Sequence, residues 1–163
     1  MLLRLVGYTQ VMYQEMRFPN LKLEHIWEDE WMIELRVSVD DGMFSGTTQI
    51  YSSWGALRDL RNRLEGYPRS TDEVVEETMG EPGGYSYLQL RFRCVDGLGH
   101  ARAEVEMEKS QQQDGSEDFR PKVKLCIPFE AGMMDRFVSQ IDALLVAKKG
   151  SAQLTAEVIQ GLD

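Results

Sequence analysis

Hydrophobic and polar positions alternate with a period of two in three consecutive segments, residues 87–94, 101–107 and 119–127. One side of each segment is apolar, while the other side is basic in the first, mostly acidic in the second and basic in the third. Alternation over seven or more residues is typical of strands that bury one face of an antiparallel sheet. We therefore expect a three-stranded meander in this part of the chain.

The charges of these segments also suggest how the strands pair. Placing Glu106 opposite Lys122 joins acids to bases on the outer face and apolar residues to one another on the inner face, as a correct register requires. A four-residue turn at residues 96–99 then sets Arg91 opposite Glu104. Because the charges satisfy one another, we interpret this face as a solvated surface rather than a binding face.

A second hairpin is predicted nearer the N-terminus. Residues 31–39 alternate with Trp31 inward, and the Asp-Gly pair at 41–42 is a strong signal for a two-residue turn that sets Val39 opposite Phe44. Residues 2–6 and 21–27 are further strand candidates.

Two segments have helical periodicity, residues 53–64 and 130–148, and the first begins at Ser52 or Ser53, which are good N-terminal caps. Residues 69–84 are acidic and rich in glycine toward their end, which predicts a loop, with a short strand at Val74 and Val75 as the alternative. Residues 151–163 are expected to form either a short amphipathic helix or a disordered tail.

Strands grouped in this way favour an α+β fold over an alternating α/β fold. We expect a single antiparallel sheet of about six to seven strands, arranged as a meander, with both helices packed on one face. Residues 1–150 would form one α+β domain, and residues 151–163 would be a C-terminal extension.

Composition adds the expected environment. Of the 163 residues 42% are hydrophobic and only two are cysteines, which is typical of a globular protein in a reducing compartment. The N-terminal apolar run is too short for a signal peptide, and no apolar segment approaches the roughly 20 residues that span a bilayer. We therefore expect a cytoplasmic protein that does not enter a membrane.

The net charge of −9 is unevenly distributed. Residues 24–41 carry seven acids and one base, and residues 71–84 carry five acids and no base. Such acidity argues against nucleic acid or an anionic membrane as a partner and permits a basic protein partner. The candidate partner-binding residues are the acids Glu28, Asp29, Glu30, Asp40, Asp41, Asp72, Glu73, Glu76 and Glu77.

Signatures of catalysis, cofactors or metals are not recognisable in the sequence. The two histidines, His25 and His100, lack partners at metal-ligand spacing, and a zinc site would need a Cys/His cluster. Asp96 and His100 could join a serine in a triad, but no Gly-x-Ser-x-Gly motif supports one. We predict no catalytic, cofactor-binding or metal-binding residues, and we expect the three tryptophans to pack in the core.

Three short motifs support a resemblance to known families. They are Phe-Pro-Asn at 18–20, Trp-Glu-Asp-Glu-Trp at 27–31, and Asp-Gly-Leu-Gly-His at 96–100, each followed by an alternating strand. Their arrangement resembles small bacterial cytosolic families, including immunity proteins of the wall-associated-toxin type. The resemblance implies a non-enzymatic inhibitor that binds one toxin.

Three hypotheses about function follow. The first is a non-enzymatic protein-binding domain of immunity type that neutralises a toxin through its acidic surface. The second is a small-molecule-binding or enzymatic α+β domain, with a pocket near Trp31, Trp54, His25 or His100. The third is a homo-oligomer that associates through an edge strand or residues 151–163.

Overall fold

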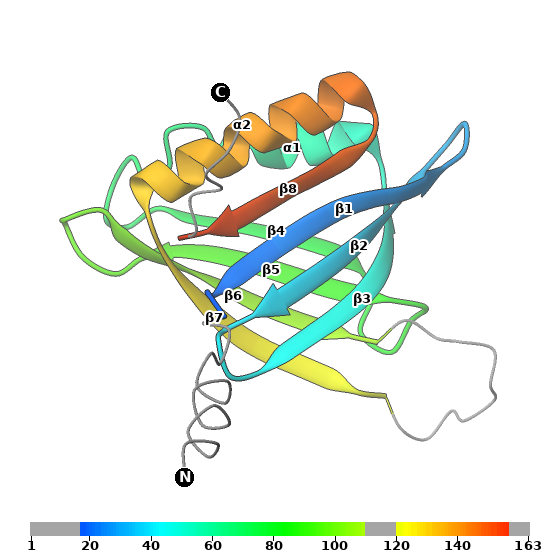
Figure 1. Ribbon diagram of the computed structural model, residues 1–163, viewed down its shortest axis with the longest axis horizontal. Helices are drawn as coiled ribbons and strands as arrows, with labels where there is room; N and C mark the ends of the chain where they lie inside the picture. Colours follow the sequence, from blue (N-terminus) through cyan, green and yellow to red (C-terminus); the bar gives the residue numbers. More distant parts are fainter. Residues whose placement is uncertain (1–16, 110–119, 157–163) are drawn as a thin grey trace, which may run out of the picture.

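The computed structural model describes residues 17–109 and 120–156, which fold into two antiparallel sheets and two helices joined by turns and loops (Figure 1). The α+β class is therefore confirmed. The predicted strand at residues 2–6 lies outside the described residues. The elements are β1 (Asn20–Glu28), β2 (Ile33–Asp40), β3 (Ser45–Ser52), α1 (Trp54–Leu64), β4 (Val74–Gly80), β5 (Tyr87–Cys94), β6 (His100–Glu108), β7 (Lys122–Glu130), α2 (Ala131–Ala147) and β8 (Gly150–Thr155).

The strands form two sheets of four, with the orders β3-β2-β1-β8 and β4-β5-β6-β7, so the prediction of a single sheet is wrong. The chain leaves the first sheet at the end of β3, passes through α1, and starts the second sheet at β4. Two facing sheets can bury their apolar faces against each other, whereas one large sheet would depend on two helices to cover its face.

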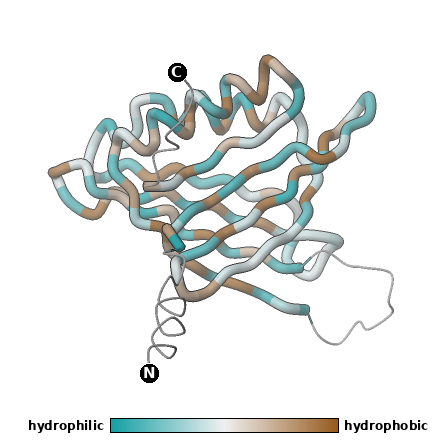
Figure 2. Tube along the Cα trace, in the orientation of Figure 1, coloured by the Kyte–Doolittle hydropathy of each residue, from teal (hydrophilic) through white to brown (hydrophobic). Residues whose placement is uncertain are grey.

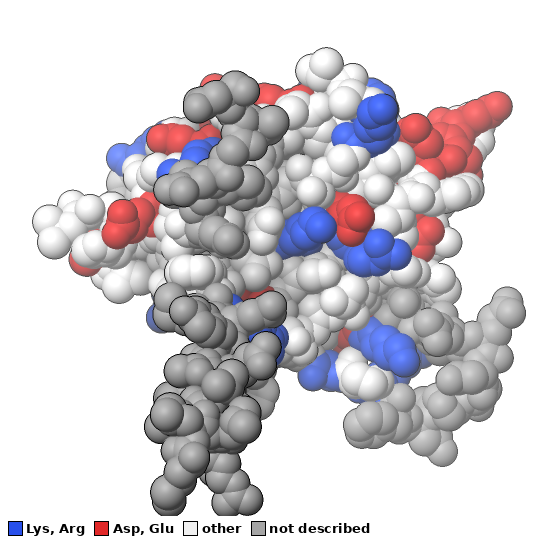
Figure 3. All heavy atoms as spheres, viewed as in Figure 1, with Lys and Arg blue, Asp and Glu red and all other residues white. Residues whose placement is uncertain are grey.

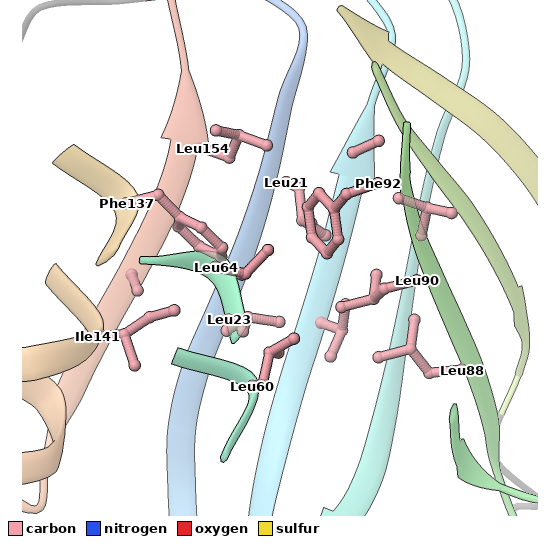
Figure 4. Close-up of a cluster of buried hydrophobic side chains, with 14 of the residues drawn as sticks. Leu21, Leu23, Leu60, Leu64, Leu88, Leu90, Phe92, Phe137, Ile141 and Leu154 are labelled. Atoms are coloured by element: carbon pink, nitrogen blue, oxygen red, sulfur yellow. The ribbon is translucent and has the colours of Figure 1, made fainter. Parts of the chain in front are cut away.

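The core lies between the two sheets and is closed along one side by both helices (Figure 1). Figure 4 shows Leu21 and Leu23 of β1 near Leu90 and Phe92 of β5, with side chains of the helices completing the cluster. Along each strand the hydropathy alternates (Figure 2), because successive side chains point to opposite faces.

Both predicted helices are present. The side chain of Ser53 accepts a hydrogen bond from the backbone N–H of Ala56 at 3.1 Å and caps α1, whose Leu57, Leu60 and Leu64 are buried. Helix α2 ends at Ala147 and is capped by Lys148, which adopts a left-handed conformation with φ 57°.

Two segments differ from their predictions. The segment 69–84, expected to be a loop with at most a short strand at Val74 and Val75, contains the longer strand β4, because Val75 and Met79 point into the core from one face of a strand. The predicted helix or tail at 151–163 begins as β8, where Ala152 and Leu154 are buried and the strand pairs with β1. Residues 157–163 lie outside the described residues.

Two registers differ from the predicted ones by two residues. Glu106 lies opposite Lys124 instead of Lys122, and Val39 lies opposite Gly46 instead of Phe44. A shift of two keeps every side chain on its predicted face, so the hydrophobic pattern does not detect it. The pairing of Arg91 with Glu104 is confirmed.

Candidate functional site

The nine acids proposed for partner binding lie in three places. Glu28, Asp29 and Glu30 form the tip of the β1–β2 hairpin, which projects as a red cluster at the upper right of Figure 3. Asp40 and Asp41 lie at the other end of β2. The remaining four, Asp72, Glu73, Glu76 and Glu77, precede or belong to β4 in the second sheet.

Most of these acids already have structural partners. Glu28 accepts a hydrogen bond from the indole N–H of Trp54 at 2.9 Å, and Asp29 accepts the backbone N–H groups of Trp31 and Met32 at 2.8 and 2.9 Å. Glu30 makes no hydrogen bond or ion pair to a described residue. The hairpin tip, residues 28–32, is therefore held in shape by two of its own acids.

The other acids are similarly occupied. Asp40 pairs with Arg17 at 2.8 Å, and Asp41 accepts the backbone N–H groups of Phe44 and Met43, which lower its pKa. Ion pairs with arginines also hold Glu73 (Arg69), Glu76 (Arg91) and Glu77 (Arg63). Asp72 makes no hydrogen bond or ion pair within the described part of the chain.

An exposed row of aromatic side chains lies beside the hairpin tip. The aromatic row consists of Trp27 on β1, Tyr51 on β3 and Tyr85 in the β4–β5 loop, which are 45%, 41% and 47% exposed. The rings of Trp27 and Tyr51 meet edge to face with centroids 6.4 Å apart, and those of Tyr51 and Tyr85 stack at 5.4 Å. Aromatic groups that touch one another in solvent are unusual, because such contacts normally belong to cores or interfaces.

A β-bulge places Trp27 on the outer face of the sheet. The pairing of β1 with β2 shifts between His25 and Trp27, so that Trp27 lies opposite the outward Glu34. Without the bulge, the alternation that buries Leu21 and Leu23 would direct Trp27 inward. The expected core packing is therefore wrong for Trp27.

Trp31 is also exposed, to 81%, which corrects its predicted inward position. Asp29 folds residues 29–32 into a turn, and β2 begins only at Ile33. The alternation of hydrophobic and polar residues continues through this turn in the sequence, but a side chain in a turn has no sheet to pack against.

Glu34 lies between the first two members of the aromatic row. It is opposite Trp27 on one neighbouring strand and opposite Tyr51 on the other. The pKa of Tyr51 is raised, chiefly by the negative charge of Glu34 and by partial burial, with Tyr85 and Asp29 adding to the effect. The carboxylates of this region are therefore close enough to act on the phenol.

The β4–β5 loop holds Tyr85 in place. Gly80 has φ +74° and lies against the carbonyl oxygen of Ser86, which accepts the backbone N–H of Glu81 at 3.1 Å. The buried carboxylate of Glu108 accepts the backbone N–H of Gly83 at 3.0 Å, and this contact is the main cause of its lowered pKa. The loop is therefore fastened at its base and near its tip.

The two histidines have different surroundings. The ring of His25 packs on the ring of Trp54, with centroids 5.0 Å apart. The ammonium nitrogen of Lys148 also lies over the Trp54 ring, 4.4 Å from its centroid. His100 contacts Asp96 at 2.6 Å between Nδ1 and Oδ2, which raises the pKa of His100 and lowers that of Asp96. The two side chains therefore contact each other, but Asp96 also accepts the backbone N–H of Leu98 and acts in the turn.

The thiol nearest this pair is Cys94, whose Sγ donates to the carbonyl oxygen of Asp96 at 2.9 Å. Its partner is thus a backbone carbonyl rather than the imidazole. A nucleophilic thiol needs a base within hydrogen-bond reach, so this geometry does not support a Cys–His pair.

A groove of about 300 Å³ lies where β3 meets β6 and β7. It is lined by Ser45, Gly46, Thr47, Met107, Lys109, Pro121, Lys122 and Val123. Neither histidine and none of the tryptophans is among these residues, so this groove does not support the predicted pocket.

Among the described residues there is no group of three or more His, Cys, Asp or Glu side chains that could hold a metal ion. No helix in the described ranges is long and apolar enough to cross a membrane.

No family model matches the chain, and comparisons with curated proteins and with solved structures gave no significant match. The assignment of a function therefore depends on the surface itself. The aromatic row and the acidic hairpin tip were not joined into one site by the sequence, because the bulge and the three-strand pairing that bring them together are tertiary features.

Proposed function

We propose that the protein is a non-enzymatic protein-binding domain that recognises a basic protein through the aromatic row and the adjoining hairpin tip. The observation that carries the proposal is the contact of Trp27, Tyr51 and Tyr85 on the exposed surface. The resemblance to immunity proteins makes a cognate toxin in the cytoplasm the first partner to test.

The composition of this surface supports binding to a protein. Tryptophan and tyrosine are enriched among the residues that dominate interface energies, because they bury a large area with few rotatable bonds. The row continues into the exposed Trp31 and the partly exposed Met32 at the hairpin tip. A partner that covered these side chains would remove apolar area from water at about 25 cal/mol per Å².

The charge of the surface supports a basic partner. Glu34 lies opposite both Trp27 and Tyr51, and its charge and that of Asp29 act on the phenol of Tyr51. No basic residue lies between positions 26 and 35. Complementary charge accelerates association and disfavours wrong partners more than it raises affinity. We therefore expect binding that weakens as salt is added.

The test is titration calorimetry of the full chain against the purified product of the neighbouring gene. Trp27→Ala and Tyr51→Ala should each weaken binding at least tenfold, as expected for interface hot spots. Phe44→Ala is the matched control, because Phe44 is 65% exposed but lies in the β2–β3 turn at the other end of β2.

Equal loss of affinity in the Phe44 control would show that the aromatic row is not the binding surface. Sedimentation of the protein alone at the same concentrations separates this proposal from self-association through an edge strand. A dimer that dissociates in Tyr51→Ala would mean that the row binds a second copy instead.

A further inference from the structure

We infer that the corner formed by Trp27, Tyr51 and Glu34 is a binding site for a guanidinium group, and that the basic partner inserts an arginine side chain there. The inference rests on the proposed function and specifies which residue type anchors the partner. Its carrying observation is the position of Glu34 on β2, opposite Trp27 on one neighbouring strand and Tyr51 on the other, whose exposed rings stand nearly perpendicular to each other.

The strand spacing shows how the corner is built. Trp27 and Tyr51 lie on strands separated by β2, so their backbones are roughly 10 Å apart, twice the usual strand spacing. Their ring centroids are nevertheless 6.4 Å apart, with an angle of 78° between the ring planes. Both side chains therefore lean over the position of Glu34, which lies between them on β2.

Glu34 is available to an external cation. The next outward residue on β2, Arg36, pairs instead with Glu24 at 3.3 Å, and Lys22 lies 3.9 Å from the same carboxylate. Glu34 makes no hydrogen bond or ion pair within residues 17–109 and 120–156. The negative charge of Glu34 is therefore uncompensated beside the exposed rings of Trp27 and Tyr51.

These features select a planar cation. A guanidinium can stack on one aromatic ring while its N–H groups at the edge donate to a carboxylate, whereas the ammonium of lysine is a hydrated point charge that cannot do both. Two rings at 78° offer one surface for stacking and a second wall beside it. Tyr85, stacked on Tyr51, fixes the orientation of the central ring.

The test is an NMR titration of the full chain with the capped tripeptide Gly-Arg-Gly, observed at the indole N–H of Trp27. We expect a dissociation constant in the millimolar range, which corresponds to a binding free energy of about 4 kcal/mol. The same peptide with citrulline, which has the shape of arginine without its charge, should bind at least tenfold more weakly. A lysine peptide should also bind more weakly than the arginine peptide.

Variants assign the binding to the corner. Glu34→Gln should weaken arginine binding about tenfold, while Glu30→Gln, which removes an equal charge from the hairpin tip, should change it less than threefold. Tyr51→Phe should retain binding because it keeps the ring, and Tyr51→Leu should lose it. The spectra of the free variants report their fold in the same experiment.

Equal binding of arginine and citrulline peptides, or unchanged binding by Glu34→Gln, would overturn the inference. Either result would leave the proposed function standing if Trp27→Ala still weakened binding of the protein partner. Conversely, arginine binding at the corner without binding of any basic protein would contradict the proposed function alone.

Discussion

Thr48 and Glu108 join the two sheets through one buried hydrogen bond. The hydroxyl of Thr48 on β3 donates to the backbone carbonyl oxygen of Glu108 on β6 at 2.7 Å, and both residues are almost fully buried. The carboxylate of the same Glu108 holds the loop that carries Tyr85. The packing of the sheets and the position of the aromatic row are thus linked at one residue.

Thr48→Val should therefore destabilise the fold. The substitution preserves the shape of the side chain but leaves a buried carbonyl without this donor, at a cost of about 1–2 kcal/mol. Urea unfolding measures the change in the free energy of unfolding. Thr47→Val is the control, because the Thr47 hydroxyl bonds Ser38 on the exposed face, and a cost as large there would contradict the prediction.

Two glycines of the β4–β5 region separate steric from conformational strain. Gly80 and Gly83 have φ of +74° and +75°, but a Cβ on Gly80 would lie 2.0 Å from the carbonyl oxygen of Ser86, while Gly83 has nothing within 4 Å. Gly83→Ala should cost about 1–2 kcal/mol for the left-handed conformation. Gly80→Ala should cost about 1–3 kcal/mol more because backbone must move, and equal unfolding free energies for the two variants would refute this account.

Arg61 holds the two helices together. Its guanidinium donates to both carboxylate oxygens of Asp142 on α2, at 2.7 and 2.9 Å, and to Glu65 on its own helix. Arg61→Lys cannot make the bidentate contact and should lower the free energy of unfolding by roughly 0.5–1.5 kcal/mol. The exposed Arg58 on the same helix gives the control, where replacement by lysine should change stability by less than about 0.5 kcal/mol.

The Asp96–His100 pair makes a prediction about pH. The pKa of His100 is raised mainly by its hydrogen bond to Asp96, with Glu130 adding a smaller effect. Through the raised pKa of His100 the pair contributes to the free energy of unfolding, and this contribution is complete below the ordinary histidine pKa of about 6.5. It is lost as pH rises through the raised value of the folded state.

Asp96→Asn should therefore lower the pKa of His100 toward its ordinary value, while the amide oxygen can still accept the turn N–H groups. The midpoint is measured by NMR titration of the His100 imidazole in the original protein and in the variant. Glu130→Gln should lower the same midpoint by less. A midpoint of His100 that does not move in Asp96→Asn would show that the pair does not form in solution.

The sequence predicted the elements well where one physical rule dominates. Period-two alternation identified β5 and β6, and the spacing of leucines together with Ser53 identified α1. Both signals are local, since they depend on which side chains leave water and on how the backbone N–H groups at a helix start are capped.

The sequence did not identify the aromatic row as a site. Trp27 reads as an inward residue of β1 until the bulge after His25 reverses its face. Tyr85 comes from a glycine-rich loop in the other sheet and meets Tyr51 only after the sheets pack. A run of acids was visible at 28–30, but its neighbouring rings were not.

Along the regular parts of the strands the sequence by itself determined which residues face water and which face the core, because hydrophobic burial acts on each side chain wherever its strand pairs. Only the tertiary structure decided the number of sheets, the two registers and the bulge. A shift of two residues leaves the burial pattern unchanged, so the choice among registers depends on packing across the core. That choice set Glu34 between Trp27 and Tyr51.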